Sequence, residues 1–270
     1  MLIADSGSTK TSWLWEGHIL ETLGINPVRD CDEAIAHVLD TLPPMQPKQV
    51  FFYGAGCIPP HSERLRALLQ ARFPQAHIAV ESDMLGAARA LCGHNEGIVC
   101  ILGTGSNSCL YDGQHITANV SPLGYILGDE GSGAVLGRTL VGDLLKGQLG
   151  EPLRQAFLDD FQLTLSDIIN KVYREPMPNR FLASLTPFLA RHRNEEGIHQ
   201  LITKEFSRFL QRNVAQYQRT DLPLHFAGSI AHAFASELHE AATRSGHRIG
   251  RILQHPILDL ALFHQSNDGN

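Results

Sequence analysis

The chain has 270 residues, of which 43% are hydrophobic and 19% charged, so its composition fits a globular protein and excludes a disordered one. A formal net charge of −6 without any basic run argues against a nucleic-acid partner. No apolar stretch reaches the length of a membrane span, no basic leader precedes the first apolar run, and the five cysteines form no C-x-x-C pair. We therefore expect a cytoplasmic protein without a membrane partner or a disulfide framework.

Strand-like apolar runs and stretches of helical spacing alternate along the first hundred or so residues. The predicted elements are, in chain order, strands at 1–4, 12–15 and 18–23, a helix at 30–42, a strand at 50–53, a helix at 62–73, a strand at 77–80 and a helix at 83–92. The order is β-β-β-α-β-α-β-α.

The second part of the chain repeats this order around a long helical segment. The predicted elements are strands at 98–102, 108–111 and 115–119, a helix from about 131 to 149, a helical insertion at about 151–217, a strand at 222–227, a helix at 230–244, a strand at 248–254 and a helix at 256–264. A duplicated unit predicts two similar α/β domains, 1–108 and 109–270, that face one another across a cleft. The segment 256–270 is free to pack back on the first domain.

Two Gly/Ser/Thr turns interrupt these strands, Asp5–Thr11 near the start of the chain and Gly103–Asn107 about a hundred residues later. A tight turn between two strands exposes several backbone N–H groups, and small residues let phosphate oxygens approach them. The pair predicts two loops that hold one nucleotide. The first turn lacks the G-x-x-x-x-G-K-[ST] spacing of a Walker P-loop.

Three aspartates stand where a predicted strand ends or a predicted helix begins. Asp5 ends the first strand, where it could hold Mg²⁺ through water or simply cap its own turn. Asp83 begins a helix, as an N-cap or as a general base at the mouth of the cleft. Asp129 lies between glycines before another helix, where it could orient a metal or a sugar hydroxyl or serve only as a helix N-cap within a loop.

Two further turns offer contacts for a sugar and a base. Asn26, before Pro27, has both a donor and an acceptor for a sugar hydroxyl or amide, although an ordinary turn explains it as well. Gly228 and Ser229 follow the strand 222–227, where the backbone could approach a flat ring such as adenine.

In this order, the motifs resemble the actin-like ATPase and sugar kinase superfamily, and more closely its N-acetylglucosamine kinase branch, which groups with the BadF/BadG-type ATPases. The resemblance covers nearly the whole chain and implies two ribonuclease H-like domains. The motifs that carry it are Asp5–Thr11, Gly24–Pro27, Ser82–Ala90, Gly103–Ser108, the GDEGS loop Gly128–Gly133 and Phe226–Ser229. Each motif alone is weak, whereas the set in this order is specific.

The resemblance implies a role for each candidate residue. Asp83 would accept the proton of the sugar hydroxyl, and Asp5 would bind the water shell of Mg²⁺. The ATP-binding residues would be Ser6, Gly7, Ser8, Thr9, Lys10, Thr104, Gly105, Gly228 and Ser229. The substrate-binding residues would be Asn26, Ser106, Asn107 and Asp129. The sequence departs from the family at Ser6-Gly7-Ser8, where members often carry three glycines, and at Pro122, near the place of another sugar-side glycine.

The expected activity is therefore phosphorylation of an amino sugar by ATP and Mg²⁺, with N-acetylglucosamine converted to its 6-phosphate. One alternative is the ATPase activator of a dehydratase, although such activators carry a recognisable cysteine pattern and here the cysteines fall mostly within predicted strands or helices. The other is a sugar sensor without catalysis, against which Asp83 and Asp129 argue. Two-domain kinases of this kind are often homodimers, but no residue pattern here defines an interface.

Overall fold

The computed structural model describes residues 1–267, and its chain divides into two compact units. Unit 1 comprises Met1–Val99, Tyr111–Thr117 and the segment from His255 onward, and unit 2 comprises Cys100–Leu110 and Ala118–Gln254. The domain boundary at residue 108 stays a prediction. The last three residues of the segment 256–270 lie outside the described residues.

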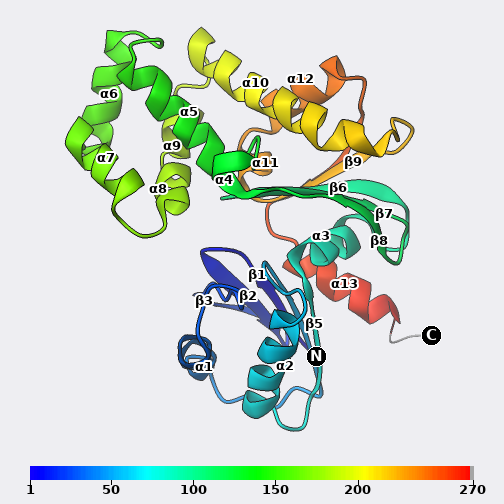
Figure 1. The fold of residues 1–270 in the computed structure, drawn as a ribbon. Coiled ribbons are helices and arrows are strands. Elements are labelled where there is room, and N and C mark those ends of the chain that lie inside the picture. The colour runs from blue at the N-terminus through cyan, green and yellow to red at the C-terminus, as the bar shows by residue number, and fades with distance from the viewer. Residues whose placement is uncertain (268–270) are drawn as a thin grey trace. The chain divides into compact units, whose positions relative to one another are not determined.

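Unit 1 contains a five-stranded mixed sheet in the order β3-β2-β1-β4-β5 (Figure 1). Its strands are β1 (Leu2–Ser6), β2 (Lys10–Trp15), β3 (His18–Leu23), β4 (Gln49–Gly54) and β5 (His77–Ser82). The first three strands form an antiparallel meander, and β4 and β5 run parallel to β1. The carboxyl ends of β1, β4 and β5 therefore meet at one edge of the sheet.

Successive side chains along a strand point to opposite faces of the sheet. In unit 1 both faces carry apolar side chains, and helices cover each of them. The helices are α1 (Asp32–Asp40), α2 (His61–Arg72), α3 (Asp83–Cys92) and α13 (Ile257–Asn267). Leu2 and Phe52 pack with Leu65 of α2 in one buried core. On the other face α3 and α13 pack together, and the Tyr53 hydroxyl lies 2.8 Å from Nε2 of His264.

The second sheet has the order β10-β9-β6-β7-β8. Its strands are β6 (Gly97–Leu102), β7 (Ser106–Tyr111), β8 (Ile116–Val120), β9 (Leu224–Ala227) and β10 (Ile249–Leu253). By position along the chain these strands repeat the order of the first sheet, with β6 in the place of β1. The predicted α/β class with a duplicated strand order is confirmed.

Helices of unit 2 fill the predicted insertion and flank the second sheet (Figure 1). They are α4 (Gly124–Leu127), α5 (Gly133–Leu145), α6 (Glu151–Phe161), α7 (Leu165–Tyr173), α8 (Pro178–Ser184), α9 (Thr186–Arg191), α10 (Glu196–Arg212), the 3₁₀ helix η1 (Val214–Tyr217), α11 (Ser229–Ala233) and α12 (Ala235–Arg244). The helical insertion is confirmed. Two details were wrong: the short α4 was not predicted, and the helix at 230–244 is broken at Phe234 into α11 and α12.

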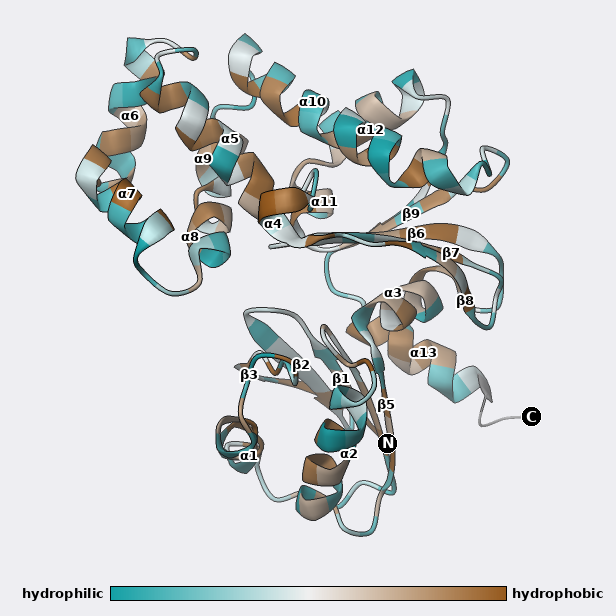
Figure 2. Cartoon of the chain, in the orientation of Figure 1, coloured by the Kyte–Doolittle hydropathy of each residue, from teal (hydrophilic) through white to brown (hydrophobic). Residues whose placement is uncertain are grey.

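The hydropathy of the helices follows their burial. In Figure 2 hydrophobic and hydrophilic residues alternate around α10 and α12, as expected for helices with one buried face. In α10 the buried side includes Ile198, Ile202, Phe206 and Phe209. Among residues 1–267 no helix is both long and apolar enough to cross a bilayer.

Candidate functional site

The carboxyl edge of the unit 1 sheet holds Asp5 and Asp83. Ser6 of β1 pairs in register with Gly54 of β4, which pairs with Ser82 of β5, so Asp83 begins α3 one residue beyond this edge. The Ser82 hydroxyl accepts a hydrogen bond from the Leu85 N–H at 3.2 Å. Ser82 is therefore the N-cap of α3, and the interpretation of Asp83 as the N-cap was wrong.

The two carboxyl groups lie within electrostatic reach of each other. Burial and, to a smaller extent, repulsion from Asp83 raise the pKa of Asp5 to about 7, against the opposing effect of the Lys10 cation. Burial also raises the pKa of Asp83, while the Met84 N–H, which donates to Oδ1 at 2.9 Å, lowers it. A raised pKa makes a carboxylate a better proton acceptor near neutral pH.

Oxygen ligands with excess negative charge are the setting that a hard cation such as Mg²⁺ prefers. Asp5 beside Asp83 fits this chemistry, because a cation would relieve both the desolvation and the mutual repulsion of the two carboxylates. Within residues 1–267 no group of three or more His, Cys, Asp or Glu side chains is arranged to hold a metal. Mg²⁺ often keeps several waters and completes its shell with phosphate oxygens, so one or two carboxylates suffice.

The first Gly/Ser/Thr turn connects β1 to β2. The Gly7 N–H donates to the Lys10 carbonyl at 3.0 Å, which closes the turn and leaves Gly7 and Thr9 exposed and Ser8 partly exposed. The Lys10 ammonium forms an ion pair with Glu21 of β3. A phosphate would have to draw Lys10 away from this carboxylate.

Ser6 has a structural role within the same turn. Its hydroxyl is fully buried and lies 2.7 Å from Oγ1 of Thr11, and it also contacts the Ile25 backbone N–H at 3.0 Å. Any contribution of Ser6 to nucleotide binding would therefore come from holding the turn in place. Gly24 lies against the turn as well, because its N–H donates to the Thr9 carbonyl at 3.0 Å and a Cβ on Gly24 would collide with the Gly7 carbonyl oxygen.

Asn26 organises the loop that follows β3. Its side-chain Oδ1 accepts the Val28 N–H at 3.0 Å, and its backbone N–H donates to the Asp30 carboxylate at 2.8 Å. The carboxamide oxygen of Asn26 is therefore part of an ordinary turn, which is one of the two interpretations that the sequence offered. The carboxamide nitrogen makes no hydrogen bond within residues 1–267, so it remains available to a ligand.

In unit 2 the second Gly/Ser/Thr turn is fixed by the start of α5. The N–H groups of Gly133 and Ala134 donate to the carbonyls of Gly103 and Thr104 at 2.8 and 3.1 Å. The Gly103 N–H donates to the Gly105 carbonyl at 2.9 Å, which closes the turn. The loop that was predicted to hold phosphate is thus held at the N-terminal end of a 13-residue helix, where the helix dipole favours an anion.

Asp129 lies against this turn. Its Oδ1 accepts the Ser106 N–H at 3.3 Å, and a Cβ on Gly105 would lie 3.1 Å from its Oδ2. Burial, with a smaller contribution from the Glu130 charge, raises the pKa of Asp129 to about 6, although the hydrogen bond from the Ser106 N–H opposes this rise. Asn107 points elsewhere, because its Oδ1 accepts the Ser108 N–H and the Asn119 side-chain amide, both at 2.9 Å.

Gly228 lies at the edge of the second sheet where the turn Gly103–Asn107 begins. Its φ of 117° and its approach to the Leu102 carbonyl, with which a Cβ would collide, both require glycine. Ser229 is exposed at the start of α11. Unit 1 thus brings together Asp5, Asp83 and the turn Ser6–Lys10, whereas unit 2 brings together Thr104, Gly105, Ser106, Asp129 and Gly228.

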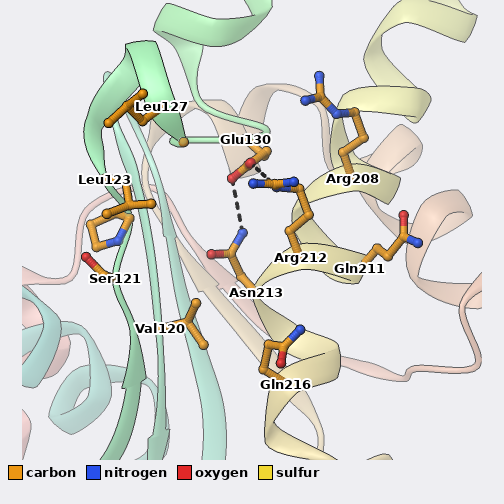
Figure 3. Close-up of a pocket in the computed structure, with 12 residues that line it drawn as sticks. Val120, Ser121, Leu123, Leu127, Glu130, Arg208, Gln211, Arg212, Asn213 and Gln216 are labelled. Carbon is orange, nitrogen blue, oxygen red and sulfur yellow. Dashed lines mark hydrogen bonds and ion pairs between the residues drawn. The ribbon is translucent and has the colours of Figure 1, made fainter.

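A pocket of about 570 Å³ in unit 2 was not predicted (Figure 3). One wall is formed by Val120–Leu123, Leu127 and Gly128, and the other by the end of α10 and the residues that follow it. Glu130, the neighbour of Asp129, lies in the pocket and pairs with Arg212. Glu130 and Arg212 lie 82 residues apart in the sequence, so no local pattern could have revealed the pair.

Comparison with solved structures finds close similarity over the whole chain. A candidate N-acetylglucosamine kinase from Porphyromonas gingivalis is 49% identical, over 99% of each chain, with a TM-score of 0.91. A candidate N-acetylglucosamine kinase from Chromobacterium violaceum is 19% identical over 97% of this chain and 98% of its own, with a TM-score of 0.74.

A more distant similarity is to a ROK family glucokinase from Streptomyces griseus in complex with glucose and AMPPNP. It is 14% identical over 98% of this chain and 100% of its own, with a TM-score of 0.57. This relation and the one to the Chromobacterium protein concern the fold alone. No protein-family model and no curated protein matches the chain. By its similarity to the Porphyromonas protein, the chain belongs to the N-acetylglucosamine kinase family.

Proposed function

We propose that the protein transfers the γ-phosphoryl group of ATP to the 6-hydroxyl of an amino sugar, with N-acetylglucosamine as the first candidate. The observation that carries the proposal is the 49% identity to the Porphyromonas protein over 99% of both chains. The paired carboxyl groups of Asp5 and Asp83, at the carboxyl ends of the parallel strands β1, β4 and β5, support it.

Asp83 is proposed as the general base. In the reaction the sugar oxygen bonds to the γ-phosphorus, the bond from that phosphorus to the ADP oxygen breaks, and the hydroxyl proton passes to the Asp83 carboxylate. The raised pKa of Asp83 supports this role, because a base works best when its pKa approaches the working pH. Positioning and electrostatics supply most of the rate in phosphoryl transfer.

Asp5 is proposed as the carboxylate that holds Mg²⁺ through water. The ion, when bound, would offset the negative charge of the phosphates during transfer. The backbone N–H groups of the turns at Gly7–Thr9 and Thr104–Gly105 would hold the phosphates, and Gly228 and Ser229 would lie against the adenosine. Small residues and a helix N-terminus at these turns favour phosphate contact.

Sugar contacts are proposed for Asn26, Ser106, Asn107 and Asp129. The available carboxamide nitrogen of Asn26 and the carboxylate of Asp129 support this, since a donor and an acceptor together recognise sugar hydroxyl groups. The side chain of Asn107 would have to leave its two internal partners, so its contribution is the weakest of the four. The homodimer and the cytoplasmic location stay predictions.

The proposal is tested by coupled ADP release with Mg·ATP against N-acetylglucosamine, glucosamine, N-acetylmuramate and glucose, with the phosphosugar identified by mass. Stimulation by one amino sugar that Asp83→Asn abolishes would support the proposal and name the substrate. ATP turnover that no sugar changes would contradict it and favour an ATPase activator. Sugar binding without turnover would favour a sensor.

A further inference from the structure

The GDEGS loop of unit 2 is held from two sides by two adjacent acidic residues. Asp129 adopts a left-handed backbone conformation with φ of 52°, which carries a steric cost relative to glycine even though aspartate tolerates it better than most residues. Its carboxylate faces the turn at Gly105 and Ser106, whereas Glu130 faces the pocket beside α10. A strained conformation persists only when the surroundings fix it, so the contacts of Glu130 bear on the position of Asp129.

Glu130 is anchored to the C-terminal end of α10 (Figure 3). Its side chain is 7% exposed and forms an ion pair with Arg212, and its Oε2 accepts the Asn213 side-chain amide at 3.4 Å. Asn213 is itself buried and also donates to the Phe209 carbonyl at 3.2 Å. Arg212 therefore supplies the one cation paired with this buried carboxylate among residues 1–267.

We propose that Arg212 is a positioning residue for sugar binding, which acts by holding Glu130 and thereby the backbone that presents Asp129. The inference rests on the proposed function, since it assumes that Asp129 contacts the sugar. Its physical basis is that a buried carboxylate without its cation tends to turn toward water, which the adjoining pocket can supply. Any such movement of Glu130 pulls on the peptide that it shares with Asp129.

The ATP side of unit 2 should be less sensitive to this change than the sugar side. The turn at Gly103–Gly105 is closed by its own hydrogen bond and is held by the N–H groups of Gly133 and Ala134 at the start of α5, in addition to its contact with the Asp129 carboxylate. Loss of the Arg212 ion pair should therefore raise the KM for the sugar more than the KM for ATP. A general loss of folded protein would instead lower the apparent activity without separating the two constants.

Arg208 offers a matched control one helical turn away. It lies on α10, lines the same pocket, is half exposed like Arg212, and pairs with a buried carboxylate, Glu205, at 3.1 Å. Among residues 1–267 the Glu205 carboxylate accepts from Thr139 of α5 and pairs with Arg208, and no hydrogen bond joins it to the GDEGS loop. Like Arg212→Gln, the variant Arg208→Gln thus removes one arginine, one ion pair and one side chain that lines the pocket. Unlike Arg212→Gln, it should not disturb Asp129.

The experiment measures KM for N-acetylglucosamine and for ATP, with thermal melting, in the full-length wild type, Arg212→Gln, Arg212→Lys and Arg208→Gln. We expect Arg212→Gln to lower kcat/KM for the sugar roughly 10- to 100-fold, the scale of an ångström-sized misplacement of a contacting group. Arg212→Lys should recover part of the loss. Arg208→Gln should leave both KM values within about twofold of wild type.

A second variant covers the outcome in which Arg212→Gln fails to fold. Glu130→Gln removes the same ion pair without leaving a buried charge, and Arg212 is exposed enough to be solvated. It should raise the sugar KM as Arg212→Gln does.

Equal effects of the Arg212 and Arg208 variants, or equal rises in both KM values, would overturn the inference alone. A wild type without any sugar turnover would overturn the proposed function and the inference with it.

Discussion

The Asp5 carboxyl should make the stability of unit 1 fall as the pH rises in the absence of metal. Its folded-state pKa is about 7, whereas an unfolded aspartate has a pKa of about 3.9. Between these values the folded state binds more protons than the unfolded state, so the free energy of unfolding decreases with pH and levels off above pH 7. Asp5→Asn cannot titrate at this position and should lose this part of the pH dependence, while the part that comes from the raised pKa of Asp83 remains.

The magnitude follows from the shift. One pH unit within this window corresponds to about 1.4 kcal/mol, so the step from pH 5 to pH 8 should cost the wild type about 2.5 kcal/mol relative to Asp5→Asn. Urea unfolding in EDTA can measure it by tryptophan fluorescence, because both tryptophans, Trp13 and Trp15, lie on β2 of unit 1.

Asp112→Asn is a suitable control in the same unit. Asp112 is exposed, and backbone N–H groups of His115 and Gln114 hold its pKa below the usual range, so it stays ionised throughout the window. Its removal should not change the slope between pH 5 and pH 8. Parallel pH profiles for the wild type and Asp5→Asn would refute the assignment of a desolvated, repelled carboxyl to Asp5.

Asp83→Asn should bind ATP normally, as measured by calorimetry, but lose sugar phosphorylation by roughly 10²-fold or more, because the hydroxyl proton has no acceptor; near-normal turnover would contradict the base assignment. Asp5→Asn should weaken the Mg²⁺ dependence of turnover, and a Mg²⁺ titration that superimposes on the wild type would contradict its metal role. Gly24→Ala should lower the melting temperature and raise the KM for ATP, because its Cβ collides with the Gly7 carbonyl of the first turn; unchanged values for both would show that the turn yields without cost.

The strand order could be predicted from the sequence because most strands contain a short apolar run and end near a Gly, Ser or Asp turn. The observed strand boundaries differ from the predicted ones by a few residues where polar residues continue the pairing between strands. The strand β2, for example, begins at Lys10 because Lys10 pairs with Leu23 of β3. The break at Phe234 could not be predicted, since residues 230–244 have continuous helical spacing. The four-residue α4 is too short to leave a periodic pattern.

The candidate site was predictable as far as it depends on the ends of strands. Asp5 and Asp83 are 78 residues apart, yet parallel pairing of β1, β4 and β5 brings them to one edge. The buried role of the Ser6 hydroxyl depends on Ile25, and the Glu130 anchor depends on Arg212. Both contacts arise from tertiary packing between segments without a shared local motif.

The chain path through the two units also constrains the order in which the protein can fold. Unit 1 begins with the first strands but is completed by α13, which follows all of unit 2 in the sequence. During synthesis α3 can cover part of the face that carries Tyr53, but the part that α13 covers with His264 and the buried Leu260 stays exposed while about 150 further residues emerge. A ribosome-bound chain that stops before α13 should therefore be a strong client for chaperones.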